Sequence, residues 1–99
     1  MGTAIRDGTM DFDLTAPGES VDVVVAEGIM RATRLSLDVA EVYFDDGRAT
    51  ARNESSHADL DPSDPGVYYL ARGQNYAFRL GDRTAAFFDA TPTGWTIFA

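Results

Sequence analysis

The sequence contains no cysteine and no lysine, and it has no long apolar run. Without cysteine, the 99-residue chain has neither a disulfide framework nor a thiolate metal site. All eight of its cations are arginine, which is typical either of a GC-rich genome or of a halophilic source. No apolar segment approaches the roughly 20 residues of a membrane-spanning helix. The N-terminus, MGTAIRDG, also lacks the charged start and apolar stretch of a secretory signal.

The charge of the chain is strongly negative. Sixteen carboxylates outnumber the eight arginines and give a net charge of −8 at pH 7. A surface of this sign repels the phosphates of nucleic acids and anionic lipid headgroups. We therefore predict that the partners are proteins rather than nucleic acid or membrane.

Length and composition predict one globular domain. Apolar residues make up 44% of the chain and charged residues 24%, which is too apolar for a disordered protein. A chain of this length suits a single core. We expect an extended N-terminal arm over residues 1–8 and one domain over residues 9–99.

The dominant pattern of the sequence has a period of two, which indicates β-strands. Met10, Phe12 and Leu14 alternate with Asp11 and Asp13, as in a strand with one buried and one acidic face. Turn residues separate the segments that follow, at a spacing typical of a β-sandwich or a small barrel. We predict an all-β fold, a single-domain antiparallel β-sandwich, jelly-roll-like or meander, with eight or nine short strands. The later strands are expected over residues 21–26, 29–39, 40–44, 48–52, 67–71, 75–80, 84–90 and 95–98, the last four closing the chain as a meander.

Two segments in the middle of the chain carry more specific expectations. Leu35, Leu37 and Val39 would form the apolar face of one strand, and the apolar phase slips at residues 40–42, which suggests a bulge or a break there. A helix over residues 36–44 is an alternative, although its β-branched and aromatic residues disfavour it.

The dipeptide Asp46-Gly47 gives the strongest hairpin signal in the sequence. It fits a two-residue type I′ turn, flanked by Asp45 and Arg48 as an exposed ion pair. The turn would join the strand that ends at Phe44 to a short edge strand over residues 48–52.

Residues 53–66 form the one long predicted loop, which holds the candidates for chemistry. Asp59, Asp61 and Asp64 are oxygen ligands of the kind that Ca²⁺ prefers, but their spacing misses the EF-hand pattern and a plain solvated loop fits equally. Ser55 or Ser56 with His57 and Asp59 would imitate a catalytic triad, but they lack a shaped pocket and an oxyanion hole. We therefore predict no enzyme activity, no cofactor and no catalytic or metal-binding residue. Whether the loop binds calcium stays open.

Pairs of adjacent aromatic residues are the most informative feature. In a strand, neighbouring side chains point to opposite faces, whereas a sandwich buries only the inner face of each sheet. The pairs would therefore place rings on the surface, where we expect Phe87, Tyr68, Tyr69 and Tyr43 to form an outward patch for protein contact. Three alternatives remain: a loop covers the outer rings, a tyrosine lies flat with its hydroxyl in water, or single exposed rings have no role.

A carbohydrate- or ligand-binding sandwich is the alternative function. Trp95, Tyr68 and Tyr69 would form an aromatic platform for sugar rings. Against this, Trp95 would fit in the core beside Ile97.

The general character of the chain resembles a known group of proteins. Its extended leader MGTAIRDGTM, its cysteine-free meander and its lack of a catalytic arrangement are similar to the small all-β accessory proteins of tailed-virus particles. The resemblance implies an oligomeric, non-enzymatic subunit that decorates a capsid or associates with a tail, and hence location in the virion. It assigns no role to any single residue.

Overall fold

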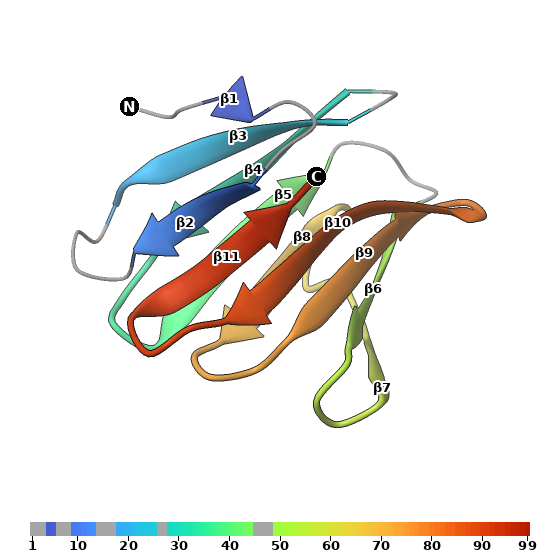
Figure 1. Cartoon of the computed structure of the whole chain (residues 1–99). Helices are drawn as coiled ribbons and strands as arrows, with labels where there is room; N and C mark the ends of the chain where they lie inside the picture. The colour runs from blue at the N-terminus through green and yellow to red at the C-terminus, as the bar shows by residue number, and fades with distance from the viewer. Residues whose placement is uncertain (1–3, 6–8, 14–17, 26–27, 45–48) are drawn as a thin grey trace.

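In a computed structural model, the chain folds into two β-sheets packed face to face (Figure 1). The structure describes residues 4–5, 9–13, 18–25, 28–44 and 49–99. Sheet A comprises, in spatial order, β1 (Ala4–Ile5), β3 (Ser20–Val25), β4 (Gly28–Arg34), β5 (Val39–Phe44) and β8 (Val67–Ala71). Sheet B comprises β2 (Thr9–Asp13), β11 (Gly94–Phe98), β10 (Arg83–Ala90), β9 (Tyr76–Leu80), β6 (Ala49–Asn53) and β7 (Ala58–Leu60). The predicted all-β sandwich is confirmed.

Over the described ranges the chain has eleven strands and no helix, so none that is long and apolar enough to cross a membrane. The expected strands are present with somewhat different bounds, and β1 and β7 are additional to the eight or nine that were predicted. Strand β7 lies within residues 53–66, which were expected to form only a loop. Strand β1 runs parallel to β3, with Ala4 opposite Asp22 and Ile5 opposite Val23.

The core lies between the sheets and is rich in aromatic rings. Phe78 of sheet B lies at its centre, 5.4 Å from Phe88 and 5.6 Å from Tyr68 of sheet A, measured between ring centroids. Near β2, Phe12 stacks on Trp95 at 6.0 Å. Gly94 passes so close to the carbonyl oxygen of Phe12 that no side chain fits between β11 and β2. The alternation of side chains along each strand thus places seven aromatic rings in the core between the sheets: Phe12, Phe44, Tyr68, Tyr76, Phe78, Phe88 and Trp95.

The predicted hairpin at Asp46-Gly47 is wrong. Strand β5 pairs with β4 and β8, whereas β6 pairs with β7 and β9 in the other sheet. The two strands flanking this dipeptide therefore do not pair, and β6 is not an edge strand. The turn residues themselves, 45–48, lie outside the described part of the chain. Strand β8 likewise belongs to sheet A, so the closing meander contains only β9, β10 and β11.

The predicted apolar face of Leu35, Leu37 and Val39 is also wrong. Strand β4 buries Met30, Ala32 and Arg34 instead, and the chain bends at residues 36–38 before β5 begins. The break therefore comes earlier than residues 40–42, which lie within β5, and the alternative helix over residues 36–44 is absent. Leu35 and Leu37 are left on the surface, with 46% and 56% of their area exposed.

Candidate functional site

Each pair of adjacent aromatic residues is divided between the core and the surface. Strand geometry turns successive side chains to opposite faces, so one ring of each pair enters the core. The buried members are Phe44, Tyr68 and Phe88, and the outward members are Tyr43 (40% exposed), Tyr69 (43%) and Phe87 (42%).

Tyr68 is therefore wrong as a member of an outward patch. Its hydroxyl donates a hydrogen bond to the carbonyl oxygen of Ala49 (3.0 Å), and its ring packs edge-on against Phe78. Burial also raises the pKa of Tyr68 above its usual value, because the charged phenolate would be desolvated. This side chain ties β8 of sheet A to β6 of sheet B.

The three exposed rings do not form one patch either. Tyr43 and Tyr69 point outward from sheet A, whereas Phe87 points outward from sheet B. Because the two sheets pack through their inner faces, these outer faces lie on opposite sides of the molecule. The exposed residues that were predicted to form one patch therefore lie on two separate surfaces.

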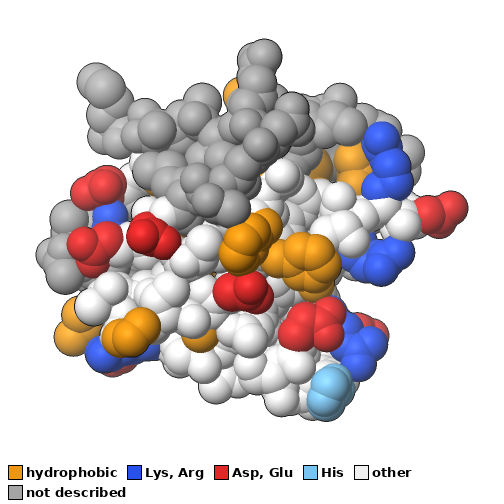
Figure 2. All heavy atoms as spheres, viewed as in Figure 1, with side chains coloured by type: hydrophobic (Ala, Val, Ile, Leu, Met, Phe, Trp, Pro, Cys, Tyr) orange, Lys and Arg blue, Asp and Glu red, His pale blue; other side chains and the backbone are white. Residues whose placement is uncertain are grey.

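On sheet B, Phe87 belongs to an apolar row that crosses three strands. Phe98 of β11 pairs with Phe87 of β10, and Phe87 pairs with Ala77 of β9. Phe98 is 39% exposed, and Figure 2 shows two neighbouring hydrophobic side chains near the middle of this face. Phe98 was not among the residues predicted for the surface patch, although its alternation with buried Ile97 was a usable signal.

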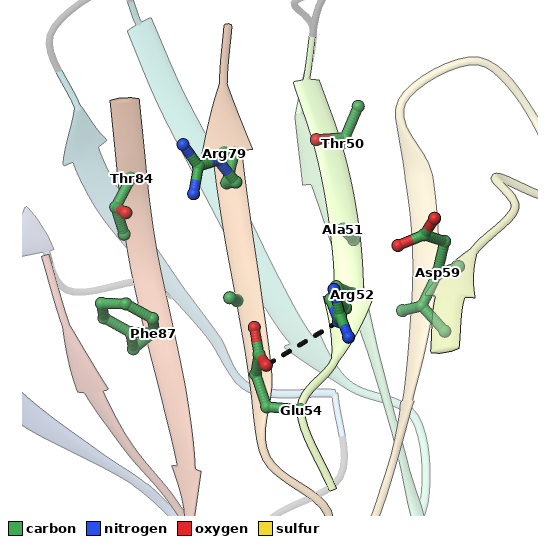
Figure 3. Close-up of a pocket in the computed structure, with 10 residues that line it drawn as sticks. Thr50, Ala51, Arg52, Glu54, Asp59, Arg79, Thr84 and Phe87 are labelled. Atoms are coloured by element: carbon green, nitrogen blue, oxygen red, sulfur yellow. Dashed lines mark ion pairs between the residues drawn. The ribbon is translucent and has the colours of Figure 1, made fainter. Parts of the chain in front are cut away.

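A hollow of about 470 Å³ lies beside this row. Ala77 stands between Phe87 and Arg52 in the strand register, and its small side chain leaves space between its larger neighbours. Figure 3 shows Phe87 on one side of the space and Asp59 on the other, with Arg52 and Glu54 between them. We call this space the outer hollow; its lining includes Thr50, Arg52, Glu54, Ala77, Arg79 and Phe87.

The outer hollow carries charges of both signs. Arg52 Nε lies 3.8 Å from Glu54 Oε2, and the arginine is about half exposed. Arg79 is exposed, and its Nη2 donates to the backbone carbonyl oxygen of Asp82 at 2.8 Å. Within the described residues Arg79 has no carboxylate partner. The hollow thus offers an apolar wall next to an arginine that no carboxylate of the described residues pairs with.

The serines and the histidine of the imagined triad serve the turn between β6 and β7. The side-chain oxygen Oδ1 of Asn53 accepts hydrogen bonds from the backbone N–H groups of Ser55 (2.8 Å) and Ser56 (3.0 Å). The Ser55 hydroxyl oxygen accepts one from the Asn75 N–H (2.9 Å), and His57 adopts a φ of 59°. Neither serine hydroxyl is bonded to the histidine, so the turn does not assemble a nucleophile and its base.

The aspartates of this segment do not assemble either. Asp59 lies on β7, and Asp61 and Asp64 follow it as exposed side chains. Among the described residues no three acidic, histidine or cysteine side chains come together as metal ligands. The calcium hypothesis therefore gains no ligand set here.

The aromatic platform for sugars, the basis of the alternative function, does not form, and the expected place of Trp95 in the core is confirmed. Trp95 is fully buried, and its indole N–H donates to the carbonyl oxygen of Gln74 at 2.9 Å. Tyr68 is buried too, which leaves Tyr69 alone on the surface.

Comparisons of the chain with protein-family models, with curated proteins and with solved structures found no match. A functional proposal therefore has to rest on the geometry of these surfaces.

Proposed function

We propose that the protein is a non-enzymatic subunit of a larger protein assembly, and that it self-associates through the outer face of sheet B. The observation that carries the proposal is the row Phe98–Phe87–Ala77 with the outer hollow beside it. Aromatic and arginine side chains are the residues that protein interfaces favour, and this face presents both.

The energy of such a contact is modest. A fully buried phenylalanine side chain contributes about 1.5–3 kcal/mol relative to an exposed one. Phe87 and Phe98 are already about three-fifths covered, so a partner would gain on the order of 1 kcal/mol from each ring. Two rings do not hold a complex together by themselves, so shape and charge around the outer hollow must add to them.

The setting of the assembly is the second part of the proposal. The general resemblance to tailed-virus accessory proteins supports a virion protein that decorates a capsid or associates with a tail. The net charge of −8 supports protein partners rather than nucleic acid. Antibodies raised against the protein should label purified virus particles in electron micrographs. If the antibodies bound the free protein but did not label the particles, this setting would be wrong.

Sedimentation velocity over a concentration series tests the contact itself. The wild-type protein should sediment as a species heavier than the 10.7 kDa monomer, and Phe87→Ser should shift it toward that monomer. Tyr69→Ser is the matched control, because Tyr69 is as exposed as Phe87 but lies on sheet A. The control should assemble as the wild type does. Equal assembly of Phe87→Ser and wild type would contradict the proposal.

A further inference from the structure

We propose that the outer hollow receives the β4–β5 turn of a second copy of this chain. The inference rests on the proposed self-association and specifies how it occurs. We call residues 35–38 (Leu35, Ser36, Leu37 and Asp38) the leucine turn.

The leucine turn is an apolar projection. Leu35 and Leu37 are 46% and 56% exposed, and Leu37 is the most exposed large hydrophobic side chain among those whose burial the structure describes. They lie where the chain passes from β4 to β5, outside both sheets. A sandwich of this size gains nothing from leaving two leucines in water, so a partner that covers them would recover part of their burial energy.

The turn is also held in one conformation. The backbone N–H groups of Leu35 and Ser36 both donate to the carbonyl oxygen of Val39, at 3.1 and 3.2 Å. The N–H of Arg72 donates to the carbonyl oxygen of Asp38 at 2.9 Å, which ties the turn to the end of β8. A preformed projection loses little conformational entropy when it binds.

The order of side chains in the leucine turn matches the outer hollow. Leu37 would lie against Phe87 and Ala77, and the next residue, Asp38, would then face Arg79. Arg79 lies two residues beyond Ala77 on the same face of β9, which is about 6.6 Å along a strand.

The charges of the two groups complete the match. The Asp38 side chain is 75% exposed, and its ion pair with Arg72 is long at 3.7 Å, so it can accept a second arginine. Arg79 lacks a carboxylate partner among the described residues. In this arrangement Leu37 contacts the apolar side of the outer hollow, and Asp38 pairs with Arg79.

Face-to-face packing of two sheets B is the competing arrangement. It would place two hollows of about 470 Å³ opposite each other and leave a void between the copies. Side chains that line a void lose their dispersion contacts, and well-packed interfaces avoid this. The leucine turn fills the hollow instead.

This contact joins different surfaces of the two copies. Each chain carries one turn and one hollow, so contacts can continue from copy to copy into a ring or a filament. The turn is smaller than the roughly 800 Å² per partner of a standard interface, so each contact is weak and repetition strengthens the assembly.

A complementation experiment distinguishes this arrangement from any symmetric one. Leu37→Asp damages the turn and leaves the hollow intact, and Phe87→Ser does the reverse. Each variant alone should self-associate about tenfold more weakly or worse. Mixed in equal amounts, they should form complexes of two chains and nothing longer, because one intact turn meets one intact hollow. Circular dichroism should show that both variants remain folded, since both side chains are exposed.

A charge exchange tests the polar half of the contact. Asp38→Arg and Arg79→Asp should each weaken assembly, and the double variant should restore it. Failure of the double variant to recover would overturn the pairing of these two residues.

The outcomes separate the inference from the proposed function. If Phe87→Ser dissociates the protein but Leu37→Asp assembles like wild type, the inference is wrong and self-association through sheet B stands. If the wild type stays monomeric up to about 1 mM, both are wrong.

Discussion

The two outer faces of the sandwich expose aromatic rings to a similar extent but arrange them differently. On sheet A, Tyr43 pairs with Arg31 and Tyr69 pairs with Glu41, so each ring has a charged neighbour on the next strand. On sheet B, Phe87 lies between two apolar neighbours, Phe98 and Ala77, and Phe87 and Ala77 line the outer hollow. Rings with the same exposed fraction can therefore have different surroundings, and the cross-strand neighbours are what favour sheet B as the proposed contact surface.

The chemistry of the rings reinforces this difference. The exposed rings of sheet A are tyrosines, which keep a hydroxyl in water while their apolar body lies on the sheet. Those of sheet B are phenylalanines, which have no polar atom to solvate. The exposed rings of sheet A are thus set among charges and hydroxyls, which suits solvent, whereas the two phenylalanines of sheet B lie next to each other, which favours a partner.

The largest expected effect comes from comparing the two sides of β10. Phe88→Ala should lower the free energy of unfolding by about 3–5 kcal/mol, because the ring is fully buried and leaves a cavity. Phe87→Ala should change it by no more than about 1 kcal/mol in dilute monomer, because its loss exposes no core. Urea unfolding followed by tryptophan fluorescence measures both. A cost for Phe87→Ala as large as that for Phe88→Ala would show that the outer face is needed for monomer folding rather than for contact.

The next effect concerns the one charged side chain that is buried among the described residues. Arg34 of sheet A lies over the ring of Phe12 in sheet B, 5.0 Å from its centroid, with Nη2 3.1 Å from Glu19 Oε2. Its Nε and Nη1 have no hydrogen-bond partner within the described chain, although Nη1 lies 3.9 Å from Asp13 Oδ1. Burying these two unsatisfied donors costs free energy. We therefore expect Arg34 to stabilise the contact between β4 and β2 through the packing of its side chain on Phe12 as well as through its charge.

Two substitutions separate these contributions at Arg34. Arg34→Met keeps most of the packing and removes the unsatisfied donors, so unfolding free energy should change by about 1 kcal/mol or less in either direction. Arg34→Ala leaves a cavity and should cost about 2–3 kcal/mol. Equal, large losses of unfolding free energy in urea would show that the ion pairs with Glu19 and Asp13 outweigh packing.

The sequence predicted the strands better than their partners. Alternation located β9, β10 and β11 almost to the residue, because each has an apolar face and turns containing glycine or proline separate them. The hairpin predicted at Asp46-Gly47 was wrong, because turn residues report only on the few residues around them. They do not reveal that β5 belongs to sheet A and β6 to sheet B.

The errors at the candidate site have equally local causes. Arg34 occupies a buried position of β4, so the apolar phase seemed to run through Leu35 and Leu37 instead. Those leucines were assigned to the core, and the leucine turn was missed. Phe87 was correctly expected on the surface, because a sandwich strand has only one inner face. The outer hollow could not be predicted, since it depends on the register that places Ala77 between Phe87 and Arg52.

The smallest expected effect is a pH dependence on the outer face of sheet A. Arg31 Nε donates to Asp22 Oδ1 at 2.7 Å, and this hydrogen bond holds the pKa of Asp22 below its usual value. A carboxylate whose folded pKa is depressed stabilises the fold above its unfolded value, about 3.9, and that stabilisation is lost as pH falls through the folded pKa. Wild type should therefore be more stable than Asp22→Asn at pH 6, and the two melting temperatures should converge toward pH 2.

A matched control makes this small difference readable. Asp61→Asn removes an exposed carboxylate that has no ion pair within the described residues, so its melting temperature should track that of wild type across the whole range. Because both partners of the Arg31–Asp22 pair are solvent-accessible, added salt should also shrink the difference at pH 6. A gap between wild type and Asp22→Asn that persists unchanged at pH 2 would mean that the asparagine disturbs packing. In that case the stability difference would not come from the Arg31–Asp22 ion pair. The charged neighbour of Tyr43 on sheet A would then have no measurable effect on stability.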